Sequence, residues 1–343
     1  MLSTLPKLAD KSFILGFLLP SILFFVGIYF VLVDVKWVQE TAKAAMNKEA
    51  LETFVWGAVA AWLFAISLSI VNHLLLQILE GYKPPFSVIP LLRARQQCDF
   101  DRLLHSISAH EKAWADEGDK YPEELRASYR RLLIRRATRF PSARTLVLPT
   151  TFGNAVRAFE DYSRTIYGAD AIPLWSHLSS VINKDFAEEL QDARTEVNSL
   201  VNIVFLAFIV AVMALSRVVY DLPWGTTVSL LWLQGVELYF LFLTAAAFFV
   251  CFGAYLLAIE RAVAWGAVVK AAFDCFLPSL ATQLGYQLPK TGNARRNFWT
   301  EVSRQSIYHD PMSVDRWKKT PSAAKEKEEE SGAEQDEDED KDD

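Results

Sequence analysis

Four long apolar segments divide the chain, and each is bounded by polar residues. They lie at about 13–33, 54–79, 200–219 and 235–258. A helix rises about 1.5 Å per residue, so roughly 20 residues cross the roughly 30 Å of hydrocarbon in a bilayer. Because backbone amides find no water in lipid, segments of this length must bond internally as helices. The pattern predicts an all-α integral membrane protein with four transmembrane helices in two hairpins.

The first apolar segment is predicted to be a retained membrane span. It is longer and more aromatic than a cleaved signal peptide, and no small-residue cleavage site follows it before Asp34. Pro20 removes a backbone donor and should kink this helix, which leaves a carbonyl for a neighbouring helix or for Ser21 to satisfy. In later segments, Gly57 and Gly253 offer small surfaces at which helices can approach closely.

The third and fourth segments belong to helical patterns that are longer than a bilayer. Apolar residues recur at three- and four-residue spacing from Asp185 to Val219, without glycine or proline. No proline interrupts 230–277 either, and Pro278 should end or bend that helix. We expect both helices to project from the membrane on one side, where they can pack together and carry the central region.

The region between the two hairpins has a helical pattern. Leu91–Ala115 and Pro122–Phe140 have helical periodicity, and the acidic turn Asp116–Lys120 separates them, which predicts an αα-hairpin. The expected division of the chain is a first transmembrane hairpin at 1–79, a helical cytoplasmic domain at 80–184, a stalk with the second transmembrane hairpin at 185–277, a cytoplasmic segment at 278–320 and a disordered acidic tail at 321–343.

The second helix of the αα-hairpin is strongly basic. No acidic residue occurs between its arginines, which are Arg126, Arg130, Arg131, Arg135, Arg136 and Arg139. At 100° per residue, most of them lie opposite an apolar side that includes Tyr129 and Leu132. Such a helix can lie on anionic lipid headgroups or bind an acidic protein partner. The alternative is a solvated face whose arginines pair with nearby carboxylates or with the acidic tail.

A helix start with several convergent polar groups follows. Thr150 or Thr151 can cap a helix that begins near Phe152, and the positive end of a helix attracts anions. The predicted residues of a phosphate or carboxylate site are Thr150, Thr151, Gly153, Asn154, Arg157 and Glu160. The alternative is an ordinary capped helix in which Arg157 pairs with Glu160 or Asp161. Gly168 suits a left-handed turn at the end of this helix.

Two segments carry a resemblance. LEGY at Leu79–Tyr82 and the sequence LPTTFGNAVRAFEDY…YGADAIPLW at 148–175 resemble a recurrent pattern in uncharacterised bacterial multi-pass membrane proteins. The resemblance covers about a third of the chain. It implies a bacterial source and a shared architecture, and it brings no reaction, ligand or catalytic residue.

Charge predicts how the chain is oriented. The formal net charge is −6, but residues 325–343 contain twelve acidic and three basic residues, so the rest of the chain is basic. Lys7 and Lys11 precede the first span, and Arg93 and Arg95 follow the second. By the positive-inside rule, both termini and the central domain should be cytoplasmic, in a bacterial inner membrane.

Motifs of known chemistry do not occur. Without GxxxxGK[ST], GxGxxG, HExxH, GxSxG or CxxC, the sequence names no nucleotide, metal or nucleophile site, and no cofactor is expected. A disulfide framework or zinc site is not supported by the scattered Cys98, Cys251 and Cys275. A membrane-bound hydrolase or transferase would have to use Asp101, His105 and Glu160. Nucleic acid is the poorer partner, because no binding module accompanies the arginines.

Three polar residues lie within the apolar segments: Asn72, His73 and Glu237. Ionisable groups in lipid are costly and often mark a pathway, so an ion channel or small-solute transporter is an alternative function. The sequence favours a non-enzymatic scaffold or sensor, assembled as a homo-oligomer through its membrane and stalk helices, whose cytoplasmic domain docks a partner.

Overall fold

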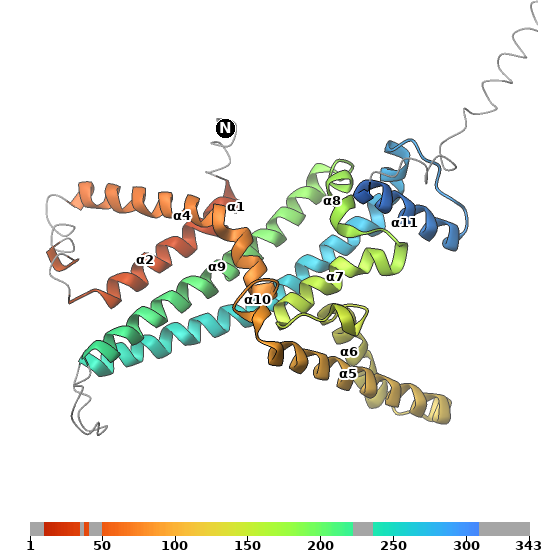
Figure 1. The fold of residues 1–343 in the computed structure, drawn as a ribbon, viewed down its shortest axis with the longest axis horizontal. Helices are drawn as coiled ribbons and strands as arrows, with labels where there is room; N and C mark the ends of the chain where they lie inside the picture. The colour runs from red at the N-terminus through yellow and green to blue at the C-terminus, as the bar shows by residue number, and fades with distance from the viewer. Residues whose placement is uncertain (1–9, 35–37, 41–49, 222–235, 309–343) are drawn as a thin grey trace, which may run out of the picture. The chain divides into compact units, whose positions relative to one another are not determined.

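The computed structural model describes residues 10–34, 38–40, 50–221 and 236–308, and these form helices and connections without a β-strand (Figure 1). Four helices within these ranges are long and apolar enough to cross a membrane: Lys11–Val31, Phe54–Glu80, Lys184–Tyr220 and Leu238–Gln283. The predicted all-helical class and the four candidate spans are therefore confirmed. The predicted acidic tail lies outside the described residues.

The helices follow one another in this order: α1 Lys11–Phe13, a π-helical turn Ile14–Leu18, α2 Leu19–Val31, α4 Ala50–Glu80, a 3₁₀ turn Phe86–Val88, α5 Pro90–Glu117, a 3₁₀ turn Gly118–Lys120, α6 Glu123–Arg139, a 3₁₀ turn Arg144–Leu146, α7 Thr151–Tyr167, α8 Ala171–Ser179, α9 Lys184–Asp221, α10 Val236–Gln283 and α11 Gly292–Tyr308.

Contacts within the chain divide it into two compact units. Unit 1 contains Met1–Phe159 and Lys184–Val269, and unit 2 contains Glu160–Asn183 and Lys270–Asp343. The divisions fall inside α7 and α10, so residues 80–184, assigned to one cytoplasmic domain from the sequence, contribute to both units.

In unit 1, α2, α9 and α10 share a core of small and β-branched residues that includes Val31, Val210 and Ala247. A Cβ at Gly27 of α2 would lie 3.0 Å from the Val210 side chain, so a larger residue would crowd this contact. Gly57 and Gly253, predicted to allow close approach, have no neighbour within 4 Å. Gly27, which the spacing of small residues did not single out, lies at a close helix contact instead.

The carbonyl that Pro20 frees in the first span has a partner on a neighbouring helix, as predicted. The missing amide of Pro20 frees the Gly16 carbonyl, which accepts a hydrogen bond from the Asn202 side chain of α9 at 2.8 Å. Ser21 donates to the Phe17 carbonyl at 2.7 Å. The helix accommodates the proline with the π-helical turn Ile14–Leu18. A neighbouring helix and the next serine thus both satisfy carbonyls of this turn.

The two long helices are confirmed in length. α9 has 38 residues and α10 has 48. Within unit 1 they run antiparallel side by side (Figure 1), and Arg261 of α10 pairs with Glu196 of α9 at 3.1 Å. Pro278 lies inside α10, which continues to Gln283. Proline therefore does not end this helix, contrary to one of the two predicted outcomes.

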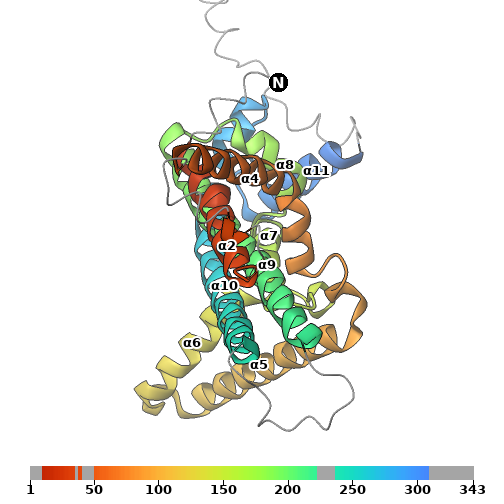
Figure 2. The same cartoon turned by 90° about the vertical axis from the view of Figure 1, so that its left-hand side faces the viewer.

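The predicted αα-hairpin is α5 and α6. Its buried core combines Phe100, Leu103 and Ile107 of α5 with Phe140 and Val147 beyond α6. Tyr129 and Leu132 of α6 cover this core, as predicted, whereas Leu125 and Leu133 are about 40% exposed. A two-helix layer has a single contact face, so residues at its margins stay in solvent. In both views the hairpin runs across the direction of α9 (Figures 1 and 2).

Unit 2 consists of α8, α11 and the ends of α7 and α10. Its fully buried side chains include Leu174 of α8, Phe273 and Leu280 of α10, and Phe298 of α11. Ser303 of α11 accepts a hydrogen bond from the Asp170 backbone amide at 2.9 Å, and Asp170 in turn caps α8. Gly168, at φ +76, ends α7 in the predicted left-handed conformation.

Candidate functional site

In unit 1 the LEGY residues Leu79–Tyr82, at the end of α4, meet the segment 148–154 that leads into α7. The amide of Gly81 donates to the Ile78 carbonyl, and that of Tyr82 donates to the Gln77 carbonyl, both at 3.0 Å. This pair of bonds is a Schellman motif, which needs a left-handed residue, and Gly81 has φ +89. Pro149 lies so close to Gly81 that a Cβ there would overlap its ring.

Thr150 joins this end of α4 to the start of α7. Its hydroxyl lies 2.7 Å from the Leu79 carbonyl and 3.0 Å from that of Glu80, and it accepts from the Gly153 amide at 2.9 Å. One buried side chain therefore satisfies the carboxyl end of one helix and the amino end of another. We call this contact, formed by Leu79–Tyr82 and 148–154, the α4–α7 joint.

Two of the first amides of α7 have partners within the chain, and Tyr255 of α10 lies beside the backbone of Thr151 and Phe152. Gly153 donates to the Thr150 hydroxyl, and Asn154 donates to the Thr150 carbonyl. Thr150 is therefore the cap that the sequence predicted, and the phosphate or carboxylate site at this helix start stays a prediction.

Asn154 fixes the loop that leads into α7. It is fully buried, accepts from the Leu148 amide at 2.7 Å and donates to the Leu148 carbonyl at 3.0 Å. Its amide also donates to Gln96 of α5, and Gln96 donates to the Thr151 hydroxyl. The α4–α7 joint therefore also contacts the α5–α6 hairpin, through Gln96. The remaining predicted ligand residues, Arg157 and Glu160, are half-buried further along α7.

Three of the six predicted surface arginines have structural roles. The Arg126 guanidinium lies over the Trp114 ring, 5.3 Å from its centroid. Arg136 donates to the carbonyls of Phe140 and Ser142 at the end of α6 and lies over the Phe100 ring. Arg139 pairs with Glu260 of α10. These side chains hold the hairpin together and tie it to α10.

The other arginines face solvent. Arg130 pairs with Glu123 at 3.1 Å. This pair fits the alternative in which arginines of a solvated face pair with nearby carboxylates. Arg131 and Arg135 are exposed, and Ile134 between them is 61% exposed. On a helix these three residues lie on one side, so they form a cationic patch with an apolar centre. We call Arg131, Ile134 and Arg135 the α6 patch.

The polar residues of the second span point in different directions. Asn72 is buried and donates to the Asn198 side chain of α9 at 3.1 Å, whereas His73 is exposed and lies 3.0 Å from Gln77 on its own helix. His73 therefore does not face the inside of the helix bundle of this chain. The Glu237 side chain lies outside the described residues. Asn72, rather than His73, lies at a helix contact.

Unit 2 contains a carboxylate shared by two tyrosines. The hydroxyls of Tyr162 and Tyr167 donate to Asp274 at 3.0 and 2.8 Å. Burial, followed by the Asp274 charge, raises the pKa of both phenols above the usual value. Both tyrosines therefore stay protonated at neutral pH and act as donors that hold the end of α7 on α10.

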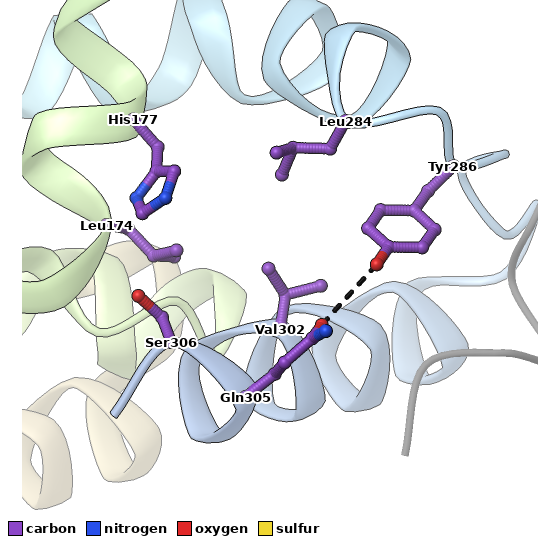
Figure 3. Close-up of a pocket in the computed structure, with 7 residues that line it drawn as sticks. All are labelled: Leu174, His177, Leu284, Tyr286, Val302, Gln305 and Ser306. Carbon is purple, nitrogen blue, oxygen red and sulfur yellow. Dashed lines mark hydrogen bonds between the residues drawn. The ribbon is translucent and has the colours of Figure 1, made fainter. Parts of the chain in front are cut away.

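Unit 2 also has a cavity of about 400 Å³, shown in Figure 3. Leu174, Leu284 and Val302 form its apolar wall, and polar groups come from His177, Tyr286, Gln305 and Ser306. The Tyr286 hydroxyl donates to Gln305 at 3.4 Å. Its volume is within the range of small-molecule pockets. The sequence interpretation missed these residues, because they come from three separate segments and match no motif.

The residues proposed for an enzyme have other partners. Asp101 pairs with Arg144 at 3.0 Å, and the side chain of His105, one turn later on α5, is exposed. In the part of the chain that the structure describes, no group of three His, Cys, Asp or Glu side chains is placed to hold a metal ion. Comparison with family models, with curated proteins and with solved structures finds no match for this chain.

Proposed function

We propose that the chain is a non-enzymatic scaffold of a bacterial inner membrane, and that its α5–α6 hairpin docks an acidic protein partner on the cytoplasmic side. The observation that carries the proposal is the α6 patch. Arg131 and Arg135 are exposed, whereas Arg126, Arg136 and Arg139 are used within the fold. A patch with an apolar centre and an arginine rim has the composition of a protein contact, because arginine is enriched at interfaces.

The α4–α7 joint supports this role, since it connects the hairpin to the membrane helices through buried hydrogen bonds. Thr150 donates to carbonyls at the end of α4, Tyr255 of α10 lies beside the start of α7, and Asn154 contacts α5 through Gln96. A partner held on the hairpin is thereby held at the membrane. Exposed apolar residues of α10, such as Phe242 and Phe249, leave room for homo-oligomer formation within the bilayer.

Site-specific photocrosslinking in cells tests the docking role. A photoreactive amino acid at Ile134 should form an adduct with an acidic protein, and Arg131→Gln with Arg135→Gln should reduce its yield at least about ten-fold, because attraction between opposite charges speeds docking. The matched control, Arg194→Gln with Arg304→Gln, removes two other exposed arginines and should leave the yield unchanged. An adduct that persists in the first double variant, or one made only with lipid, would contradict the proposal.

A further inference from the structure

Exposed apolar side chains follow immediately after the second candidate membrane span. α4 ends at Glu80, and the exposed fractions are 66% for Val88 and 41% for Ile89 in the connection to α5, and 76% for Leu91 in the first turn of α5. Burying such side chains is favourable. Three of them lie within four positions, and such a concentration of exposed apolar side chains indicates an interaction site.

The connection folds back on itself instead of leading away from α4. The Ser87 amide donates to the Lys83 carbonyl, and the amide of Val88 donates to that of Pro85, both at 3.4 Å. The residues Phe86–Val88 then form a 3₁₀ turn. Because the chain is compact here, Val88 and Leu91 stay near the end of α4. This continuity with a membrane span indicates that lipid covers the apolar surface.

The charges beside this surface have one sign. Lys83 and Arg95 are exposed, and residues 81–97 contain no acidic side chain. Basic residues next to a bilayer are attracted to anionic lipids. Arg93 has another role, since it donates to the Val147 carbonyl at 3.0 Å and so holds the start of α5 on the α4–α7 joint.

We propose that the connection between α4 and α5 is an interfacial membrane anchor. Val88, Ile89 and Leu91 insert among the headgroups and upper acyl chains of the leaflet at which α4 ends, and Lys83 and Arg95 contact the phosphates of anionic lipids. This anchor holds the base of the hairpin on the bilayer, and α5 then leaves across the direction of α9 (Figure 2).

Depth-dependent quenching tests the anchor in the full chain. The three cysteines are replaced by serine, and an environment-sensitive dye is attached at Leu91→Cys in vesicles of phosphatidylcholine with phosphatidylglycerol. Lipids with a spin label near the headgroup should quench this dye at least about three-fold more than the same dye at Ala115→Cys, because only residue 91 is inserted. Both side chains are exposed on α5. A dye at Phe249→Cys, on the exposed surface of the α10 span, is the positive control.

Equal quenching at residues 91 and 115, whether weak or strong, would overturn the anchor. Lys83→Gln with Arg95→Gln should make quenching at residue 91 independent of phosphatidylglycerol, and a lipid dependence that survives this change would exclude the proposed phosphate contacts. Neither result bears on the α6 patch, since the vesicles contain no partner protein. The anchor and the docking function can therefore fail separately.

Discussion

Gly153 sets how closely α7 approaches the end of α4. A Cβ at this position would overlap the backbone carbonyl of Glu80, and the carbonyl cannot rotate away because it belongs to the helix end held by Thr150. The contact is therefore between two backbones, and only glycine allows it.

Substitution of this glycine should destabilise the protein strongly. We expect Gly153→Ala to lower the free energy of unfolding by about 3 kcal/mol, since overpacking against a fixed neighbour displaces backbone. Reversible unfolding in mixed micelles, followed by circular dichroism, measures the loss. Gly57→Ala is the matched control: this helical glycine has no neighbour within 4 Å, and alanine favours helix. An equal loss of unfolding free energy in Gly153→Ala and Gly57→Ala would show that the close contact in the α4–α7 joint does not cause the destabilisation.

At the residue scale, contacts between residues close in the sequence could be predicted, whereas contacts between distant residues could not. The cap at Thr150 was predictable because a cap and its amide are three residues apart, yet its second partner, Leu79, is 71 residues away. Tyr255, which lies beside the start of α7, comes from another helix and could not be placed there from the sequence.

At the scale of elements, apolar periodicity located the long helices well. Length and hydropathy are properties of consecutive residues, so the spans, the αα-hairpin and the extended α9 and α10 could be predicted. The sequence did not show which arginines of α6 pack inward. Arg136 lies on the face of α6 that meets α5 and Arg131 does not, and only the structure shows which face that is. The cavity of unit 2 escaped prediction for the same reason, since it exists only where α8 and α11 meet.

The first span allows a test of whether Asn202 of α9 compensates for the helical hydrogen bond that Pro20 removes. Asn202→Ala should destabilise the protein by about 1 kcal/mol, because it leaves the Gly16 carbonyl without a partner in a buried contact. Pro20→Ala restores an amide that can bond to Gly16 within the helix. In the Pro20→Ala background, Asn202→Ala should therefore cost less.

A double-mutant cycle measures this coupling. Unfolding free energies of the wild type, both single variants and the double variant give the interaction energy, which should be favourable and about 1 kcal/mol. Additive effects would mean that Asn202 does not serve the carbonyl freed by Pro20. Ser216→Ala is a suitable control, since Ser216 is an exposed residue of α9 that bonds only to its own helix, at the Met213 carbonyl.

At the scale of the whole molecule, the proposed docking function depends on the side of the membrane on which the α5–α6 hairpin lies. Lys7 and Lys11 precede the first span, and Arg93 and Arg95 follow the second, so the positive-inside rule predicts that the N-terminus and the α5–α6 hairpin lie in the cytoplasm. The native Cys98 of α5 is exposed and can report this orientation. Cys251 and Cys275 are replaced by serine so that a single thiol remains.

A membrane-impermeant maleimide should label Cys98 only after the inner membrane is broken. In intact spheroplasts it should instead label a cysteine placed at Ser229, in the short polar connection that the rule assigns to the opposite side. Labelling of Cys98 in intact spheroplasts would put the α6 patch outside the cell and remove the cytoplasmic partner from the proposed function. The lipid anchor would survive that result, because Val88 and Leu91 adjoin the end of α4 on either side of the bilayer. Orientation and anchoring are thus independent properties of the same short segment.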